Sequence, residues 1–432
     1  MNNTQVNGPE HFDVVVAGGG SAGVGAAVGA ARAGARTLLI ERSGCLGGAA
    51  TMRNVLTYCG LYTISDEPRP AVLGVADEIV QRLRARGAAQ GPKRFRGVFV
   101  LFDPEAAKIA MDDVCAEAGV DVLLHAPIID ATRENGLVRS AVVQDGTGRR
   151  TFTAEAFVDA SGDGDLAFLA GASTRYGNHG WINIGTLGTR FGGIAPSADV
   201  SAARWSDAIR EAKAEGVPNL SKEKSLVVRL PISGDVVSYL VAEEYDARDA
   251  RSISGAERRG RRQAWSYLDV IRRLPGHENA YLASTGPEFG VRESRHVNAC
   301  YQLTKNDVAS GARFDDCVAL GAWGMEFHDP ATLDSSFALP GGRGTYDIPL
   351  RCLTSADTPN LFAAGRTADG DQYAGASLRV MGTAFATGQA AGVAAASLAG
   401  RGTLNRSEVR SELVRQGALI DADALPEPVP LV

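Results

Sequence analysis

One stretch near the N-terminus, residues 13–48, constrains the fold of this chain more than any other. It reads DVVVAGGGSAGVGAAVGAARAGARTLLIERSGCLGG, in which an apolar run ends in glycines and a small-residue pattern leads to a second apolar run and Glu41. This order predicts a strand, a tight turn, a helix and a second strand. Within it, Gly18, Gly20 and Gly23 have the spacing G-x-G-x-x-G.

The three glycines suit a phosphate-binding turn. Gly18 permits the turn out of the strand, Gly20 lets the backbone approach a pyrophosphate, and Gly23 lets the helix pack closely on the sheet. The helix N-terminus then directs free N–H groups at the phosphates. An acid at the end of the next strand, here Glu41, binds a ribose hydroxyl. The stretch therefore predicts a dinucleotide site, with NAD and FAD both open, formed by Gly18, Gly20, Ser21, Ala22, Gly23, Glu41 and Arg42.

Length and charge narrow the class of protein. A chain of 432 residues exceeds the usual size of one hydrophobic core, so we expect two domains. A net charge of −6 argues against affinity for nucleic acid or for an anionic membrane. The densest basic run, RRGRR at 258–262, is interpreted as a solvated helix face. No stretch of about 18 residues is apolar enough to span a bilayer, so membrane insertion is not expected.

Cysteine usage and the N-terminal segment indicate the compartment. Residues 1–12 lack the basic-then-apolar plan of a signal peptide. The six cysteines are scattered without metal-type pairs, which suits a reducing compartment better than a disulfide framework. The six histidines are scattered too, so no metal site is predicted. We expect a soluble, cytoplasmic protein.

Turn signals and periodicity divide the chain into elements. Residues 71–87 and 103–118 have helical patterns, 120–124 is a strand, and 128–132, 138–144 and 150–154 form an antiparallel meander. A separate short strand is expected at 156–160, and a long helix at 377–399. We predict an α/β protein with a Rossmann-like domain, built on a parallel central sheet and the meander, and an inserted α+β substrate domain. The expected boundaries are 1–171 for the first part, 172–344 for the insertion and 345–432 for the second part.

Three further stretches bear on which dinucleotide is bound. FVDASGD at 157–163 and NLFAAGR at 360–366 are strands that end in small residues, where a sheet must let a cofactor pass. SLRVMGT at 377–383 opens the long helix. The N-terminus of a helix supplies the positive potential that a reduced flavin needs at its N1–C2=O edge, and Arg379 in the first turn would strengthen it. Together these stretches favour FAD.

The chain resembles the FAD-dependent oxidoreductase family with an FAD domain of the glutathione-reductase type. It is similar to the branch with E-R-x-x-x-L-G-G (41–48), D-A-S/T-G-D (159–163), G-x-R-E-S/T-R (290–295) and A-G-R…S-x-R-V-M…G-Q-A-A-G (364–392). The resemblance implies a noncovalent FAD, with adenosine ribose on Glu41 and pyrophosphate over 18–23. It further implies adenine beside Ile128, the ribityl chain near Gly48 and Gly365, and the flavin ring against the Arg379 helix. The remaining cofactor residues that it implies are Gly47, Ser161, Gly162 and Val380.

Two departures from relatives concern how the flavin is reduced. Disulfide reductases carry a C-x-x-x-x-C pair after the second strand, whereas here Cys45 is followed five residues later by Ala50. Those enzymes also have a second G-x-G-x-x-G for NAD(P)H, and no second copy lies in a strand–helix context here. We therefore expect direct reduction of the flavin by an organic substrate bound under the inserted domain.

Residue type suggests candidates for the catalytic groups that would act on the substrate beside the flavin ring. His328 is a candidate base for proton removal coupled to hydride transfer to flavin N5. Arg292 and Arg295 would share a face if helical. They could clamp a carboxylate, or form a salt bridge with Glu293, Glu288 or a neighbouring acid. Cys45 and Cys59 are each interpreted as a redox thiol, a covalent flavin tether, a substrate contact or a small buried apolar residue. The sequence does not select the base, because other residues have the same standing: His179, His296, Tyr176 and Tyr373.

The expected function is hydride transfer between a small organic substrate and FAD, which an external electron acceptor reoxidises. Three alternatives stay open: a flavin monooxygenase, a flavin-bearing subunit that relays electrons in a larger complex, and an NAD-binding sensor. The substrate itself is not fixed by the sequence, because fold does not determine function. Assembly into a homo-oligomer also stays open.

Overall fold

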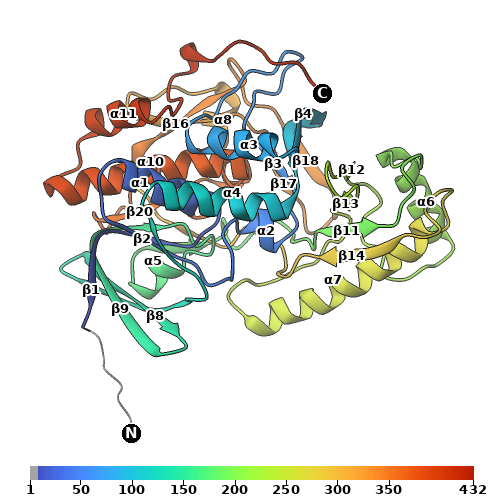
Figure 1. The fold of residues 1–432 in the computed structure, drawn as a ribbon, viewed down its shortest axis with the longest axis horizontal. Coiled ribbons are helices and arrows are strands. Elements are labelled where there is room, and N and C mark those ends of the chain that lie inside the picture. Colours follow the sequence, from blue (N-terminus) through green and yellow to red (C-terminus); the bar gives the residue numbers. More distant parts are fainter. Residues whose placement is uncertain (1–7) are drawn as a thin grey trace, which may run out of the picture.

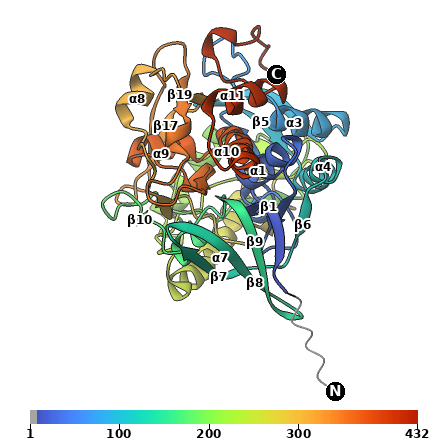
Figure 2. The same ribbon diagram turned by 90° about the vertical axis from the view of Figure 1, so that its left-hand side faces the viewer.

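The structure, a computed structural model, describes residues 8–432, so residues 1–7 of the N-terminal segment discussed above lie outside the described residues. A seven-stranded sheet forms the centre, with the order β6-β2-β1-β9-β8-β7 and β20 paired to β9. Its strands are β1 (Glu10–Ala17), β2 (Thr37–Ile40), β6 (Asp121–Leu123), β7 (Ile128–Glu134), β8 (Leu137–Asp145), β9 (Gly148–Asp159) and β20 (Leu361–Ala363). Pairs among β6, β2, β1, β9 and β20 are parallel, while β7, β8 and β9 form an antiparallel meander. The predicted parallel sheet with a meander is confirmed (Figures 1 and 2).

Strand β9 corrects one prediction. Residues 150–154 and 156–160 were expected as two strands, but Gly148–Asp159 is one continuous strand. Its first half pairs with β8 and its second half with β20, while β1 runs along most of its length. The connecting sequence Ala154-Glu155-Ala156 contains no glycine or proline, so nothing interrupts the extended backbone.

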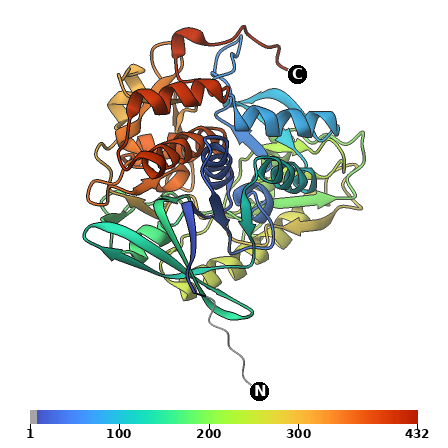
Figure 3. The ribbon, with the colours of Figure 1, turned by 60° about the vertical axis from the view of Figure 1, so that its left-hand side comes forward.

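Helix α1 (Ser21–Arg32) packs against helix α10 (Met381–Arg401) at very close range. A Cβ atom added to Gly392 would lie 1.9 Å from the carbonyl oxygen of Ala26, and one added to Gly388 would lie 2.0 Å from that of Ala22. The small residues of both helices are therefore required by this crossing. Figure 3 shows α10, near the C-terminus, lying beside α1.

The long helix expected at 377–399 is two helices. Helix α9 (Gln372–Leu378) begins at Asp371, whose carboxylate accepts hydrogen bonds from the N–H groups of Tyr373 and Ala374. The helix ends at Arg379, and Val380 is extended, with φ −68° and ψ 147°, before α10 begins. Arg379 thus precedes the first turn of α10 instead of belonging to it.

A short helix, α2 (Ala49–Met52), and a second sheet follow in this part of the chain. The sheet has the antiparallel order β3-β5-β4, formed by β3 (Thr57–Cys59), β4 (Ala89–Phe95) and β5 (Gly97–Phe102). The other helices of this part are α3 (Val75–Ala85) and α4 (Pro104–Glu117), and α5 (Asp165–Leu169) follows β9. Both α3 and α4 lie at the positions that periodicity predicts. Helix α11 (Arg406–Arg415) packs on α10 near the end of the chain.

Part of the insertion has its own apolar core, formed by residues between Leu187 and Val291. It consists of a sheet of order β12-β13-β11-β14 with two helices, and Figure 1 shows it on the right. Its elements are β11 (Thr189–Gly192), α6 (Ala202–Ala214), β12 (Val227–Arg229), β13 (Val236–Ser238), α7 (Ala250–Ile271) and β14 (Tyr281–Thr285).

Residues 303–348 join a different core, the one that contains α1 and α10. The elements around this stretch are β10 (Thr174–Tyr176), β15 (Arg295–Val297), α8 (Lys305–Ser310), β16 (Cys317–Gly321), β17 (Met325–His328), β18 (Ser335–Ala338) and β19 (Tyr346–Pro349). Within the predicted insertion, 172–344, the two parts therefore differ in the core that they join. Among residues 8–432 no helix is both long and apolar enough to cross a membrane.

Candidate active site

The N-terminus of α1 is open. Its N-cap, Gly20, makes no side-chain hydrogen bond, and the buried hydroxyl of Ser21 has no partner among the described residues. A Cβ atom at Gly23 would lie only 1.7 Å from the carbonyl oxygen of Gly18, so the turn requires glycine there. Free N–H groups, an unpaired hydroxyl and the positive end of the helix dipole together fit a phosphate group.

Glu41 lies beside this turn, at the end of β2. Its carboxylate is buried and accepts hydrogen bonds from the N–H groups of Gly19 (2.6 Å) and Ser43 (2.7 Å). Arg42 is exposed and forms an ion pair with Glu288 at 2.9 Å. Ile128, the residue predicted beside adenine, is half-buried at the start of β7.

Two further groups of predicted residues surround the turn. Gly47 and Gly48 lie against Gly20. Gly47 forms an isolated β-bridge with Gly20, and a Cβ atom at Gly48 would lie 3.0 Å from the Cα of Gly20. On the side of β9, the Ser161 hydroxyl donates to Asp159 at 2.7 Å. A Cβ at Gly162 would lie 2.4 Å from the guanidinium of Arg366.

The N-terminus of α10 resembles that of α1. Its N-cap, Val380, offers no capping side chain, and the buried hydroxyl of Thr383 has no partner among residues 8–432. The N–H group of Gly365 donates to Thr387 at 3.1 Å, and a Cβ at Gly365 would lie 2.9 Å from that of Ala22. The starts of α1 and α10 and the end of β20 are thus held together by close contacts.

A cavity of about 480 Å³ lies at the start of α10. Its walls come from residues 49–59, the hairpin of β4 and β5, the insertion, the hairpin of β17 and β18, and residues 379–381. The structure brings Cys59, Arg292, His328, Arg379 and Val380 together in its lining.

Arg295 does not line the cavity. Residues 291–294 are not helical and Arg295 begins β15, so it shares no helix face with Arg292. Its guanidinium instead lies 3.6 Å from the Asp165 carboxylate and over the ring of Phe168. Arg295 therefore packs against helix α5, which follows β9.

His328 ends β17 and is buried in the cavity wall. The pKa of its imidazole lies well below the usual value because burial, and then the positive charges of Arg292 and Arg379, disfavour the protonated ring. Its Nδ1 has no hydrogen-bond partner among the described residues, and its Nε2 lies 3.7 Å from the carboxylate of Glu326. The ring is therefore neutral at pH 7.

Cys59 has different properties. Its sulfur lies 3.8 Å from the hydroxyl of Thr57, and burial raises the pKa of the thiol to about 12. The thiol is therefore protonated at neutral pH and is a weak nucleophile, because the thiolate is the reactive form.

Comparisons with known proteins decide the family. The model of the FAD dependent oxidoreductase family matches residues 13–416. The chain belongs to this family. FAD is therefore its cofactor, and the two open helix N-termini, their unpaired hydroxyls and the buried Glu41 fit that molecule. A search of curated proteins gives no match.

Solved structures of similar fold come from several flavoenzymes. A geranylgeranyl bacteriochlorophyll reductase-like protein from Thermoplasma acidophilum is 15% identical, with a TM-score of 0.48 over 95% of this chain and 85% of that one. The p-nitrophenol 4-monooxygenase of Pseudomonas putida is 13% identical, with a TM-score of 0.49 over 94% and 85%. A myxobacterial chondrochloren halogenase is 15% identical, with a TM-score of 0.45 over 94% and 79%. At these values the similarities say nothing about the substrate of this FAD-dependent oxidoreductase.

The charge of the cavity was not evident from the sequence. The chain is acidic overall, yet eight cationic side chains and only three acidic ones line the cavity. The cations are Arg53, Arg96, Lys213, Lys222, Lys224, Arg292, Arg366 and Arg379, and the acids are Glu223, Glu326 and Asp334. Arg53 and Lys222 belong to no motif, so no local signal could have found them.

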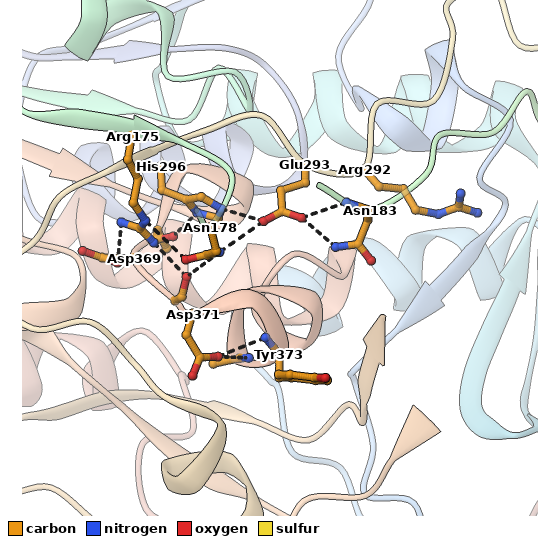
Figure 4. A network of polar contacts seen from close by, with 12 residues as sticks. Arg175, Asn178, Asn183, Arg292, Glu293, His296, Asp369, Asp371 and Tyr373 are labelled. Carbon is orange, nitrogen blue, oxygen red and sulfur yellow. Dashed lines mark hydrogen bonds and ion pairs between the residues drawn. The ribbon is translucent and has the colours of Figure 1, made fainter. Parts of the chain in front are cut away.

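A buried polar network lies behind Arg292 (Figure 4). Glu293 accepts hydrogen bonds from the backbone and side-chain N–H groups of Asn183, at 2.9 and 2.7 Å, and from Asn178 at 3.3 Å. The side-chain oxygen of Asn183 in turn accepts from the backbone N–H of His328 at 2.8 Å. Figure 4 shows Glu293 directed into this network and Arg292 directed away from it. The network therefore connects the segment that carries Arg292 with the strand that carries His328.

Proposed function

We propose that this FAD-dependent oxidoreductase is of the dehydrogenase or oxidase type, with His328 as the base. It oxidises a small organic substrate in the cavity at the start of α10. The observation that carries the proposal is the position of His328 in the lining of that cavity, where its depressed pKa keeps the imidazole neutral. When bound, FAD supplies the two-electron acceptor at flavin N5, and an external acceptor such as oxygen, a quinone or another protein reoxidises it.

The chain's own residues have distinct tasks in this proposal. His328 takes the proton from a substrate hydroxyl or amine, which is the task of a general base with a pKa below the working pH. Arg379 and the N-terminus of α10 favour the negative charge that develops in the electron acceptor. Arg379 is held for this by a hydrogen bond to the carbonyl oxygen of Glu326 at 3.1 Å.

We also propose the domain boundaries and the cellular location of the protein. We propose the division 1–171, 172–344 and 345–432, with the substrate between the FAD-binding parts and the insertion. A cytoplasmic location is supported by the six cysteines, all of which are free thiols.

Product analysis tests the reaction type. A dehydrogenase or oxidase gives a product that is two hydrogen atoms lighter than its substrate and does not need NAD(P)H. A flavin monooxygenase consumes NAD(P)H and adds one oxygen atom. Mass spectrometry of products formed under labelled oxygen, with and without NADPH, separates the two, and incorporation of label that depends on NADPH would refute the proposal.

A further inference from the structure

We propose that the substrate is an organic carboxylate, bound through its anionic group by Arg292 and assisted by Lys222. This inference rests on the proposed function, since it names the substrate class of the same cavity. It is drawn from the state of the cationic side chains there, which differ in whether they already have acidic partners.

Arg292 has donors that no protein group among residues 8–432 uses. One nitrogen, Nη1, donates to the carbonyl oxygen of Ile184 at 2.6 Å, and no carboxylate lies within 4.0 Å of the guanidinium among the described residues. A guanidinium carries five N–H donors, so most of them are left without a protein acceptor. The nitrogens of Arg292 that have no protein partner are exposed to solvent. By contrast, Nε of Arg379 is buried and has no partner among the described residues. The free donors of Arg292 are accessible to a ligand.

Two other arginines in the lining are already paired. Arg366 forms an ion pair with Asp163 at 3.3 Å and donates to the carbonyl oxygen of Val291. Arg53 lies 3.6 Å from the carboxylate of Glu288. Their charges are balanced within the protein, so they offer an incoming anion less than Arg292 does.

Lys222 is another cation of the lining that forms no ion pair with an acidic residue among the described residues. Its backbone is fixed, because its N–H group donates to the Tyr267 hydroxyl at 2.8 Å and its carbonyl oxygen accepts from the same hydroxyl at 2.7 Å. Its Nζ has no hydrogen bond or ion pair within residues 8–432, although it lines the cavity. The insertion thus holds an amine without a partner among these residues in the lining of the cavity.

The geometry of a guanidinium favours a carboxylate. Its planar pair of N–H groups matches the two oxygens of a carboxylate, and such a charge-assisted pair is stronger than a neutral hydrogen bond. The excess of cations in the cavity contrasts with the net charge of −6 for the whole chain. A local cationic field in a concave site raises the concentration of anions there.

Binding of a matched pair of probes tests the proposal on the FAD-loaded, full-length protein. Benzoate and benzamide have nearly the same shape and differ in charge, and calorimetry measures both. We expect benzoate to bind at least tenfold more tightly than benzamide. The variant Arg292→Met should weaken benzoate roughly 10- to 100-fold, with benzamide binding and FAD content unchanged. Arg262→Met, on the exposed face of α7, is the matched control and should change neither.

Three results of these binding measurements would overturn the proposal that the substrate is a carboxylate. Equal binding of the two probes, unchanged benzoate binding in Arg292→Met, or no binding of benzoate at all overturns the proposal. If Arg292→Met does not fold, Lys222→Met replaces it and should weaken benzoate roughly three- to tenfold. A protein that holds FAD and oxidises neutral substrates without preference for carboxylates contradicts this inference alone. A protein that takes up no FAD contradicts the proposed function.

Discussion

Nε2 of His296 lies 3.2 Å from Oε1 of Glu293, and both side chains are buried. Nδ1 of the same ring lies 2.9 Å from the carbonyl oxygen of Ala368. A carbonyl and an ionised carboxylate only accept hydrogen bonds, so both ring nitrogens carry hydrogen. Burial opposes ionisation of Glu293, but the hydrogen bonds from His296 and Asn183 hold its pKa below the usual range. The two residues form a buried ion pair behind the cavity.

Removal of one charge from this pair should be costly. We expect Glu293→Gln to lower the free energy of unfolding by about 3 kcal/mol at pH 7, because it leaves an uncompensated buried imidazolium. Denaturant titration measures the change. Glu215→Gln, which removes an exposed ion pair with Arg273, is the control and should cost less than about 1 kcal/mol.

The same variant has a defined dependence on pH. The pKa of Glu293 is lower in the folded protein than in the unfolded chain, where it is about 4.3. Its stabilising contribution is therefore present above that value and is lost as the pH falls through the folded pKa. Melting temperatures of the two proteins should converge below about pH 4. A difference that stays constant down to pH 3 would contradict the ion pair.

The crossing of α1 and α10 gives a further prediction. Gly392→Ala places a Cβ atom 1.9 Å from the carbonyl oxygen of Ala26, so we expect a loss of several kcal/mol, about 3, together with weaker FAD binding. Gly400→Ala, in the same helix, meets nothing within 4 Å and should stabilise the protein by up to about 1 kcal/mol. Thermal unfolding of the pair checks the crossing, and equal effects would contradict it.

Much of the FAD-binding part could be predicted because its signals are local. The turn of Gly18, Gly20 and Gly23 and the acid Glu41 follow from spacing alone, as does the meander from its turn residues. The break at Arg379 and Val380 could not be predicted, because neither residue is a glycine or proline that would signal it. It depends on the Asp371 cap, which starts a separate short helix.

The environment of the cavity residues could not be predicted from the sequence in the same way. His328 and Arg292 could be named as candidates by residue type, but their environment depends on contacts between distant segments. Glu293 receives its hydrogen bonds from Asn183, 110 positions away, and His328 is connected to Asn183 across 145 positions. Lys222 lines the cavity only because the insertion, to which it belongs, forms part of the cavity wall.

Anion binding should depend on pH through Lys222. Burial, followed by the charge of Arg292, lowers the pKa of this amine to about 7, against the smaller opposing effects of Glu326 and Asp334. The amine is charged below that pH and neutral above it. Benzoate affinity should therefore fall as the pH rises from 6 to 8, and Lys222→Met should flatten this dependence. An unchanged slope in the variant would show that another group titrates.

His328 should control turnover and not cofactor binding. We expect His328→Asn to lower kcat about 10²- to 10⁴-fold, the usual contribution of a general base, with FAD content unchanged. Because the pKa of His328 lies well below 6.5, the acid limb of the wild-type profile should also lie below that pH. His179→Asn, at an exposed position, is the control. Full activity of His328→Asn would exclude it as the base.

The most direct measurement of the central claim is the visible absorbance of the purified protein under anaerobic conditions while organic carboxylates are added. The account predicts a yellow protein that carries FAD and whose flavin absorbance is bleached by such a substrate with no NAD(P)H present. A colourless protein that takes up no FAD, or a flavin that only NAD(P)H bleaches, would contradict it.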